Sequence, residues 1–100
     1  MGEPSLLISV VIPTRDRAVY LRETLRTVLA IDDPEVEIVV SDNASEDDTK
    51  AVVASFTDQR LRYVNPGRRV SMRANFDFAF RQSNGQYLLY ICLLYTSRCV

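Results

Sequence analysis

The sequence predicts an α/β domain built on an open, mostly parallel sheet with helices on both faces. Four short runs rich in β-branched and aromatic residues, at about 6–12, 36–41, 61–64 and 87–91, alternate with segments of helical periodicity. The runs contain few polar residues, which is typical of strands that are covered on both faces. No hairpin signal joins any two of them, so we expect helical crossovers and parallel strands.

The first run, Leu6 to Ile12, has one polar member, Ser9, and is expected to be a buried strand. Pro13 cannot donate to a sheet ladder, so the strand is expected to end there. The polar residues that follow, Thr14 to Arg17, are then delivered at the carboxyl end of a parallel strand. In open α/β sheets ligands bind at that end.

A helix is expected after this loop, because apolar residues recur at i, i+4, i+7 and i+8: Leu21, Leu25, Val28 and Leu29. Asp16 is the expected N-cap, with Thr14 as the alternative. The helix is expected to end before the segment Asp32-Asp33-Pro34, because proline disfavours a helical residue before it.

The second run is closed by a polar segment that begins Ser41, Asp42, Asn43. A strand, a helix and a second strand form a right-handed crossover with parallel strands. Asp42 is therefore expected beside the loop at 13–17. Ser45 and Asp48 approximate a capping box, which predicts a second helix over about 46–57.

The rest of the chain repeats the alternation. The run at 61–64 is followed by a turn at 65–67 and by a predicted helix over about 71–83. Gly85 is expected to end that helix in the left-handed conformation. The run at 87–91 is expected to be a fourth buried strand.

Composition excludes several classes of site. The 100 residues include no His, which excludes His-based triads and most zinc sites. The only glycines are Gly2, Gly67 and Gly85, and the only lysine is Lys50, so neither glycine-rich phosphate-binding motif can form. Any phosphate ligand must be held by other side chains and by the loop at 13–17.

Charge is divided unevenly along the chain. The formal net charge is −1, yet the acidic residues lie mostly in the first half and the second half is basic. We expect the two signs to satisfy each other in part. No apolar run approaches the roughly 20 residues of a membrane helix. The amino terminus has no basic leader, so a cytoplasmic location is expected.

Three segments together resemble the amino-terminal half of a family 2 glycosyltransferase: ISVVIPTRDR, EIVVSDNASEDDT and RYVNPGRRVSMRANFDFAFRQSNGQYLLYI. The resemblance covers residues 6–91 and marks 5–91 as a truncated nucleotide-sugar-binding domain. It implies a GT-A fold with a Rossmann-like nucleotide-binding half. It also implies transfer of a sugar from a UDP- or dTDP-linked donor to a hydroxyl of an acceptor sugar or lipid, as in cell wall or polysaccharide biosynthesis.

The resemblance also implies which residues bind the donor: Pro13, Thr14, Arg15, Asp42, Asn43, Arg73 and Asn75. The first three line the nucleoside pocket, the acidic residue and its neighbour bind the base or ribose, and the last two close the pocket. The chemistry is suitable, because a carboxylate accepts hydrogen bonds from a uracil N–H or from ribose hydroxyls. An arginine stacks on a base or reaches a diphosphate.

Most of these positions also have a purely structural interpretation. Thr14 and Asp16 can cap a helix, 42–45 can form a polar turn without a ligand, and Asn75 can hydrogen-bond within its own helix. Two further cations are expected to be solvated or near the diphosphate rather than to read the base: Arg68 and Arg69.

The match breaks after the fourth run. In the family an acidic triplet follows and holds manganese or magnesium on the diphosphate, but here no acidic residue follows Asp77. The expected metal therefore has no ligands in this chain, no catalytic residue is predicted, and the 100-residue chain is expected to be inactive. The segment 92–100, CLLYTSRCV, resembles translated sequencing-adapter read-through, so we expect the reading frame to be spurious after about Ile91. The alternative is a divergent but genuine segment.

Two other functions are considered. One is a non-catalytic nucleotide-binding or regulatory module on the same sheet. The other is nucleic-acid binding through Tyr63 and several arginines: Arg60, Arg62, Arg68, Arg69 and Arg73. The negative net charge and the single lysine count against the latter, so no nucleic-acid partner is expected.

Overall fold

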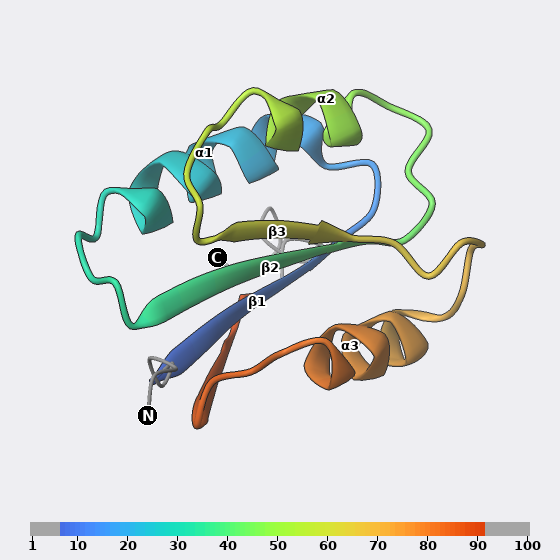
Figure 1. Ribbon diagram of the computed structural model, residues 1–100. Coiled ribbons are helices and arrows are strands. Elements are labelled where there is room, and N and C mark those ends of the chain that lie inside the picture. Colours follow the sequence, from blue (N-terminus) through green and yellow to red (C-terminus); the bar gives the residue numbers. More distant parts are fainter. Residues whose placement is uncertain (1–6, 92–100) are drawn as a thin grey trace, which may run out of the picture.

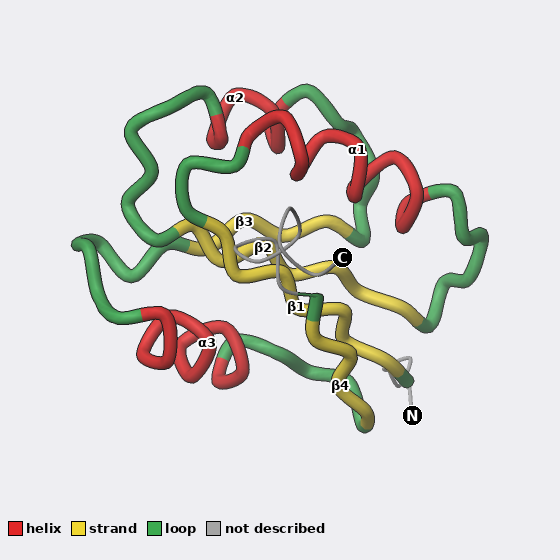
Figure 2. Tube along the Cα trace, turned by 180° about the vertical axis from the view of Figure 1, so that it is seen from behind, coloured by secondary structure: helices red, strands yellow, loops and turns green. Residues whose placement is uncertain are grey.

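A computed structural model describes residues 7–91 as four parallel strands with helices on both faces (Figure 1). The elements are β1 (Ile8–Thr14), α1 (Ala18–Leu29), β2 (Val36–Asp42), α2 (Thr49–Ala54), β3 (Leu61–Val64), α3 (Met72–Arg81) and β4 (Tyr87–Tyr90). The strand order is β3-β2-β1-β4. Helices α1 and α2 cover one face and α3 covers the other (Figures 1 and 2). The predicted fold class is confirmed.

The expectation that β1 ends at Pro13 is wrong. The strand continues to Thr14, and Pro13 pairs with Ser41 of β2. The carbonyl of Val11 accepts from Ile91, so Val11 bonds toward β4 and Pro13, two residues on, points the same way. β4 ends at Tyr90, level with Val11, and the missing N–H of Pro13 therefore interrupts no ladder bond.

The helix starts also differ from expectation, because Asp47, rather than a predicted cap, accepts from the first N–H groups of both α1 and α2. Helix α1 begins after Arg17, and the backbone N–H of Ala18 donates to Asp47 Oδ2 at 3.1 Å, not to Asp16 or Thr14. Helix α2 begins only at Thr49, whose N–H donates to Asp47 Oδ1 at 3.0 Å. A cap that is 29 residues away cannot be read from local spacing.

The face under α1 and α2 is an apolar core. Alternate residues of β1 and β2 point to this face and form one buried cluster with Leu21 and Leu25 of α1: Val10, Ile12, Ile38 and Val40. The predicted helical face of α1 is thereby confirmed at its three buried positions, which are Leu21, Leu25 and Val28. This face supplies the apolar burial that stabilises the domain.

The face under α3 is different, because it carries a buried carboxylate. Glu37 of β2 is 4% exposed. It accepts hydrogen bonds from Ser9 Oγ at 2.5 Å, from the backbone N–H of Asn84 at 2.6 Å and from Arg62 at 3.0 Å. Burial alone would raise the pKa of Glu37, but these donors outweigh it and lower the pKa below its ordinary value. The sequence did not predict this network.

Two expectations about the last strand are corrected. Gly85 is not left-handed; it is needed because an added Cβ would lie 2.6 Å from the backbone nitrogen of Ser9. β4 is an edge strand rather than a buried one, and Tyr87 is 66% exposed (Figure 2). Leu6 and the segment 92–100 lie outside the described residues. Within 7–91, no helix is long and apolar enough to cross a membrane.

Candidate functional site at the carboxyl edge of the sheet

Three loops meet where β1, β2 and β3 end: 15–17, 43–48 and 65–71 (Figure 1). They lie together because parallel strands end at one edge of the sheet. Thr14 and Asp42 are register partners at the ends of β1 and β2. The N–H of Asn43 donates to the carbonyl of Thr14 at 2.8 Å. The predicted juxtaposition of the first two loops is confirmed.

Asp42 is 2% exposed and is held by two donors. Its Oδ1 accepts from the N–H of Ser45 at 3.0 Å, and its Oδ2 accepts from the Tyr63 hydroxyl at 2.6 Å. Burial, followed by the bond to Asp42, raises the pKa of Tyr63 and keeps the phenol as a donor. A carboxylate has about four acceptor positions, so this side chain retains capacity for further donors.

Thr14 has a buried hydroxyl with no hydrogen-bond partner. Its Oγ1 is the one buried side-chain nitrogen or oxygen atom within residues 7–91 that lacks a partner. Thr14 does not cap α1, which begins four residues later. A buried polar atom without a partner is costly to the fold, so this hydroxyl still has the capacity to bond with a polar group of a ligand.

The two predicted asparagines make their contacts within the protein. Asn43 Oδ1 accepts from the N–H of Val70 at 2.8 Å, and Asn43 Nδ2 donates to the carbonyl of Val70 at 2.7 Å. Asn75 Oδ1 accepts from Ser41 Oγ at 2.6 Å, and Asn75 Nδ2 donates to the carbonyl of Ser41 at 3.0 Å. The alternative that Asn75 bonds within its own helix is wrong. These amides fix the third loop and α3 against β2.

The two predicted arginines have no such partners. Arg15 is half-buried and Arg73 is exposed, and within the described chain neither makes a side-chain hydrogen bond or an ion pair. Arg73 lies in the first turn of α3, where it lines a cavity of about 410 Å³. Both guanidinium groups remain available to an anionic or aromatic ligand.

Asp16 connects all three loops, which the sequence did not predict. Its N–H donates to Ser45 Oγ at 2.8 Å, and its Oδ1 accepts from the N–H of Glu46 at 2.7 Å. Its Oδ2 forms an ion pair with Arg69 at 3.4 Å. The φ angle of Asp16 is +54°, a left-handed conformation that Asp tolerates better than most residues. That preference was the available signal, but Asp16 was assigned only as a cap.

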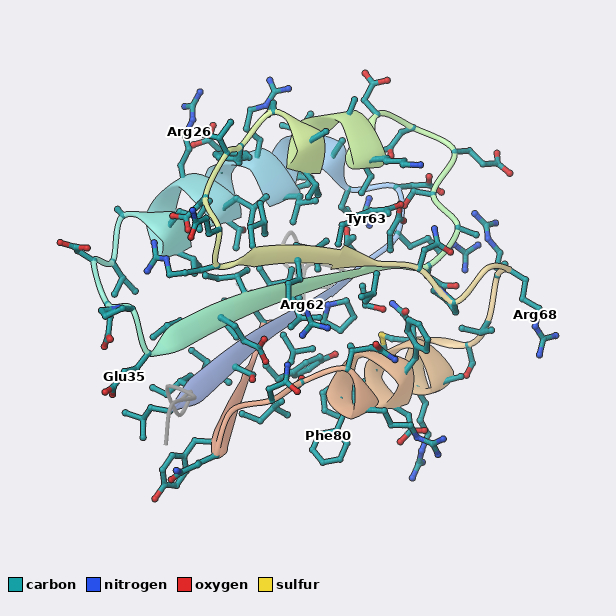
Figure 3. The ribbon with its side chains drawn as sticks, viewed as in Figure 1. Arg26, Glu35, Arg62, Tyr63, Arg68 and Phe80 are labelled. Atoms are coloured by element: carbon teal, nitrogen blue, oxygen red, sulfur yellow. The ribbon has the colours of Figure 1, made fainter. Side chains whose placement is uncertain are left out.

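Tyr63 was also missed as a partner of Asp42. It pairs with Val40 in the β2–β3 register, so it points to the same face as Asp42, two residues further along β2. Figure 3 shows Tyr63 and Arg62 on opposite sides of β3. Side chains alternate between the two faces of β3, so the sequence would have indicated this contact if the strand order had been known.

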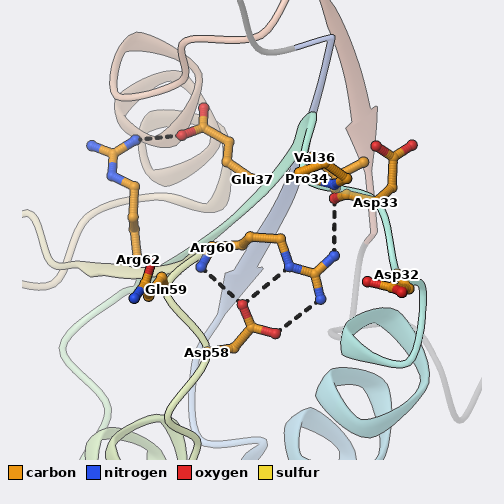
Figure 4. Close-up of a pocket in the computed structure, with 9 residues that line it drawn as sticks. All are labelled: Asp32, Asp33, Pro34, Val36, Glu37, Asp58, Gln59, Arg60 and Arg62. Carbon is orange, nitrogen blue, oxygen red and sulfur yellow. Dashed lines mark hydrogen bonds and ion pairs between the residues drawn. The ribbon is translucent and has the colours of Figure 1, made fainter. Parts of the chain in front are cut away.

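A cavity of about 640 Å³ lies at the opposite, amino edge of the sheet (Figure 4). Its arginines are already paired: Arg62 contacts Glu37 at 3.0 Å, and Arg60 contacts Asp58 at 2.9 Å. The hydrogen bonds of Arg60 lower the pKa of Asp58 to about 2. Arg60 also donates to the carbonyl of Leu29 at the end of α1. This cavity is the larger of the two, but the guanidinium groups of its two arginines already have partners within the protein.

The described residues do not fit the metal that the resemblance implies. Within 7–91, no group of three or more His, Cys, Asp or Glu side chains is arranged to hold a metal ion. Oxygen ligands from several carboxylates would be required for Mn²⁺ or Mg²⁺. We therefore derive no step through a metal from these residues.

Comparison with known proteins places the chain in a family. Residues 9–92 match the family model described as glycosyl transferase family 2. The chain is 31% identical over 87 residues to the GalNAc(5)-diNAcBac-PP-undecaprenol beta-1,3-glucosyltransferase of Campylobacter jejuni, covering 84% of this chain and 28% of that protein. It is 44% identical over 77 residues to the validoxylamine A glucosyltransferase of Streptomyces hygroscopicus subsp. jinggangensis, covering 69% of this chain and 18% of that protein.

Solved structures agree. The structure of S. aureus TarS 1–349 in complex with UDP superposes with a TM-score of 0.80 at 25% identity, covering 87% of this chain and 27% of that one. The mannosyltransferase PcManGT from Pyrobaculum calidifontis, in complex with GDP-Man and Mn²⁺, gives 0.74 at 26% identity, covering 85% and 26%. The chain thus spans less than a third of the length of these relatives and has the sheet and helices of a GT-A fold. It belongs to glycosyltransferase family 2.

Proposed function

We propose that the carboxyl edge of this sheet binds the nucleotide of a nucleotide-diphosphate sugar, as the donor-binding part of a longer glycosyltransferase. Family membership supports the reaction class, which is transfer of a sugar to an acceptor hydroxyl. The UDP, UDP-GlcNAc and GDP-Man complexes of similar structures support the ligand class. From the sequence we propose a uridine or thymidine nucleotide.

The observation that carries this proposal is the pairing of Thr14 with Asp42 at the ends of adjacent strands, where the Thr14 hydroxyl lacks a partner. A nucleoside offers N–H and hydroxyl donors to the Asp42 carboxylate and a polar partner to Thr14. The guanidinium groups of Arg15 and Arg73 supply charge and a stacking surface nearby. Pro13 precedes Thr14 in β1 and is buried.

In this proposal the described residues bind and orient the donor. Asn43 and Asn75 act through position, because they fix the third loop and α3 against β2. An acceptor sugar or lipid, a general base and a Mn²⁺ or Mg²⁺ site would come from the remainder of a longer protein that acts in the cytoplasm. Residues 5–91 would form its donor-binding unit.

The test is calorimetric titration of the chain with UDP, dTDP and GDP. Asp42→Asn should weaken binding of the preferred nucleotide by about tenfold, because a charge-assisted hydrogen bond is lost. The matched control is Asp33→Asn, at the amino-edge cavity, which should bind as the unmodified chain does. The proposal fails if no nucleotide binds, or if Asp33→Asn weakens binding as much as Asp42→Asn does.

A further inference from the structure

We propose that Arg69 binds the phosphate groups of the donor and that Asp16 holds this arginine in place until the ligand replaces it. The inference rests on the proposed function and adds a specific phosphate-binding residue to it. Arg69 lies in the loop between β3 and α3, and Asp16 lies in the loop after β1. Their ion pair therefore spans the carboxyl edge of the sheet.

The geometry of this ion pair is that of a weak contact, in which a ligand can replace Asp16 as the partner of Arg69. Arg69 Nη2 and Asp16 Oδ2 are 3.4 Å apart, whereas strong charge-assisted N–H···O bonds measure about 2.7–2.9 Å. Both side chains are 42% exposed, so solvent and ligands reach them. An exposed pair of this kind contributes little to stability, which makes its replacement inexpensive in free energy.

Asp16 keeps its position without Arg69. Its backbone N–H is bonded to Ser45 Oγ, and its Oδ1 accepts from the N–H of Glu46. By contrast, the ion pair with Asp16 is the one hydrogen-bonded or ionic contact of the Arg69 guanidinium in the described chain. The neighbouring Val70 is fixed by Asn43, so the guanidinium can move while its backbone stays in place.

Charge in this segment points to an anionic ligand. Residues 59–76 contain five arginines and no carboxylate. Two of them, Arg60 and Arg62, are used inside the fold, which leaves Arg68, Arg69 and Arg73 without a strong internal partner. Figure 3 shows Arg68 extending away from the domain at this edge.

The diphosphate of the donor is the anion that still needs a binding group among the described residues. Neither glycine-rich phosphate-binding motif can form, and residues 7–91 contain no metal-binding cluster. The forked guanidinium group pairs with two phosphate oxygens at once. The proposed step breaks no covalent bond: N–H donors of Arg69 leave Asp16 Oδ2 and take phosphate oxygens, and Asp16 then stands as a like charge beside the ligand.

The test is calorimetric titration with uridine, UMP and UDP at low and at physiological salt. Arg69→Ala should weaken UDP binding on the order of tenfold and leave uridine binding unchanged, since only the phosphates lose a partner. Asp16→Asn keeps an acceptor for Glu46 but removes the competing charge, so it should tighten UDP binding several-fold. The effect of Arg69→Ala should shrink at higher salt.

The matched control is Arg26→Ala, since Arg26 forms a similar exposed ion pair with Glu23 at 3.5 Å on the outer side of α1 (Figure 3). It should leave UDP affinity unchanged.

If Arg69→Ala does not affect UDP binding, the inference about Arg69 is overturned, but the proposed function is not. Absence of both uridine and UDP binding by the unmodified chain overturns the proposed function and the inference with it. If Asp16→Asn fails to fold in thermal melts, Arg69→Ala decides the case.

Discussion

Both edges of the sheet carry polar and charged side chains, but those at the amino edge have partners within the protein and several of those at the carboxyl edge do not. At the amino edge, Glu37 accepts hydrogen bonds from Ser9, Arg62 and Asn84, and Arg60 is enclosed by Asp58 and backbone carbonyls. At the carboxyl edge, a buried hydroxyl lacks a partner, and the arginines are unpaired or held by a long contact. The amino edge has the larger of the cavities described above. Our proposal that the ligand binds at the carboxyl edge therefore rests on unsatisfied polar groups rather than on cavity volume.

The largest expected effect is at the amino edge. Glu37→Ala removes the acceptor of Ser9 and of the N–H of Asn84 and breaks the buried ion pair with Arg62, so it should cost about 3–5 kcal/mol in the free energy of unfolding. Urea denaturation measures the loss. Glu35→Ala, at an exposed neighbouring position, should change it by less than about 0.5 kcal/mol. Equal effects of the two variants would show that the buried network does not stabilise the fold.

A smaller loss is expected at Gly85. An added Cβ would meet the backbone of β1 at 2.6 Å, so Gly85→Ala should destabilise by about 1–3 kcal/mol. Gly67→Ala is the contrast at the carboxyl edge, since its Cβ would meet open space and only the positive φ opposes it. That variant should cost about 1 kcal/mol. Thermal unfolding of the two variants would contradict the account if Gly67→Ala were the more damaging.

Low pH should reduce the folding stability that Asp58 contributes at the amino edge. The folded pKa of Asp58 is about 2, below its unfolded value of about 4. Its contribution is therefore fully present above about pH 4 and is lost as the pH falls through about 2. Since the side chain is partly exposed, we expect at most about 2 kcal/mol. Asp58→Asn should lose that stability at pH 7 and be less sensitive to acid in unfolding experiments. An unchanged acid limb in the variant would refute this assignment.

One buried hydroxyl from each edge allows the two edges to be compared directly, and the smallest effect of all is expected at the carboxyl edge. Ser9→Ala removes the donor to Glu37 and the acceptor for Gly85, and should destabilise by about 1–3 kcal/mol. Thr14→Val removes a hydroxyl that has no partner, so stability should stay the same or rise by up to about 1 kcal/mol. Denaturation curves compare the two. A clear destabilisation by Thr14→Val would mean that the hydroxyl has a structural role.

The sequence was sufficient for the order of elements and for the first three strands. Apolar runs that alternate with helical periodicity lead directly to β1, β2 and β3, and the run at 61–64 is confirmed to the residue. It was not sufficient for the helix starts, because Asp47 accepts from the first N–H groups of both α1 and α2. The contact with Thr49 is local, but the contact with Ala18 depends on how two loops pack, which no local pattern encodes.

The candidate site was predictable only in part. The meeting of Thr14 and Asp42 follows from parallel topology alone. The contacts of Asn75 and Glu37 require distant partners, Ser41 and Arg62, that only the folded sheet brings near. One signal for Glu37 was present: an acid within an otherwise apolar strand needs buried donors.

The most direct test of the central claim is a map of backbone amide shifts in ¹H–¹⁵N spectra of the chain as UDP is added. The account predicts saturable shifts at 14–17, 42–48 and 65–73, with little change at 33–37 and 58–62. Saturable shifts confined to the amino-edge residues, or no shifts at all, would contradict it.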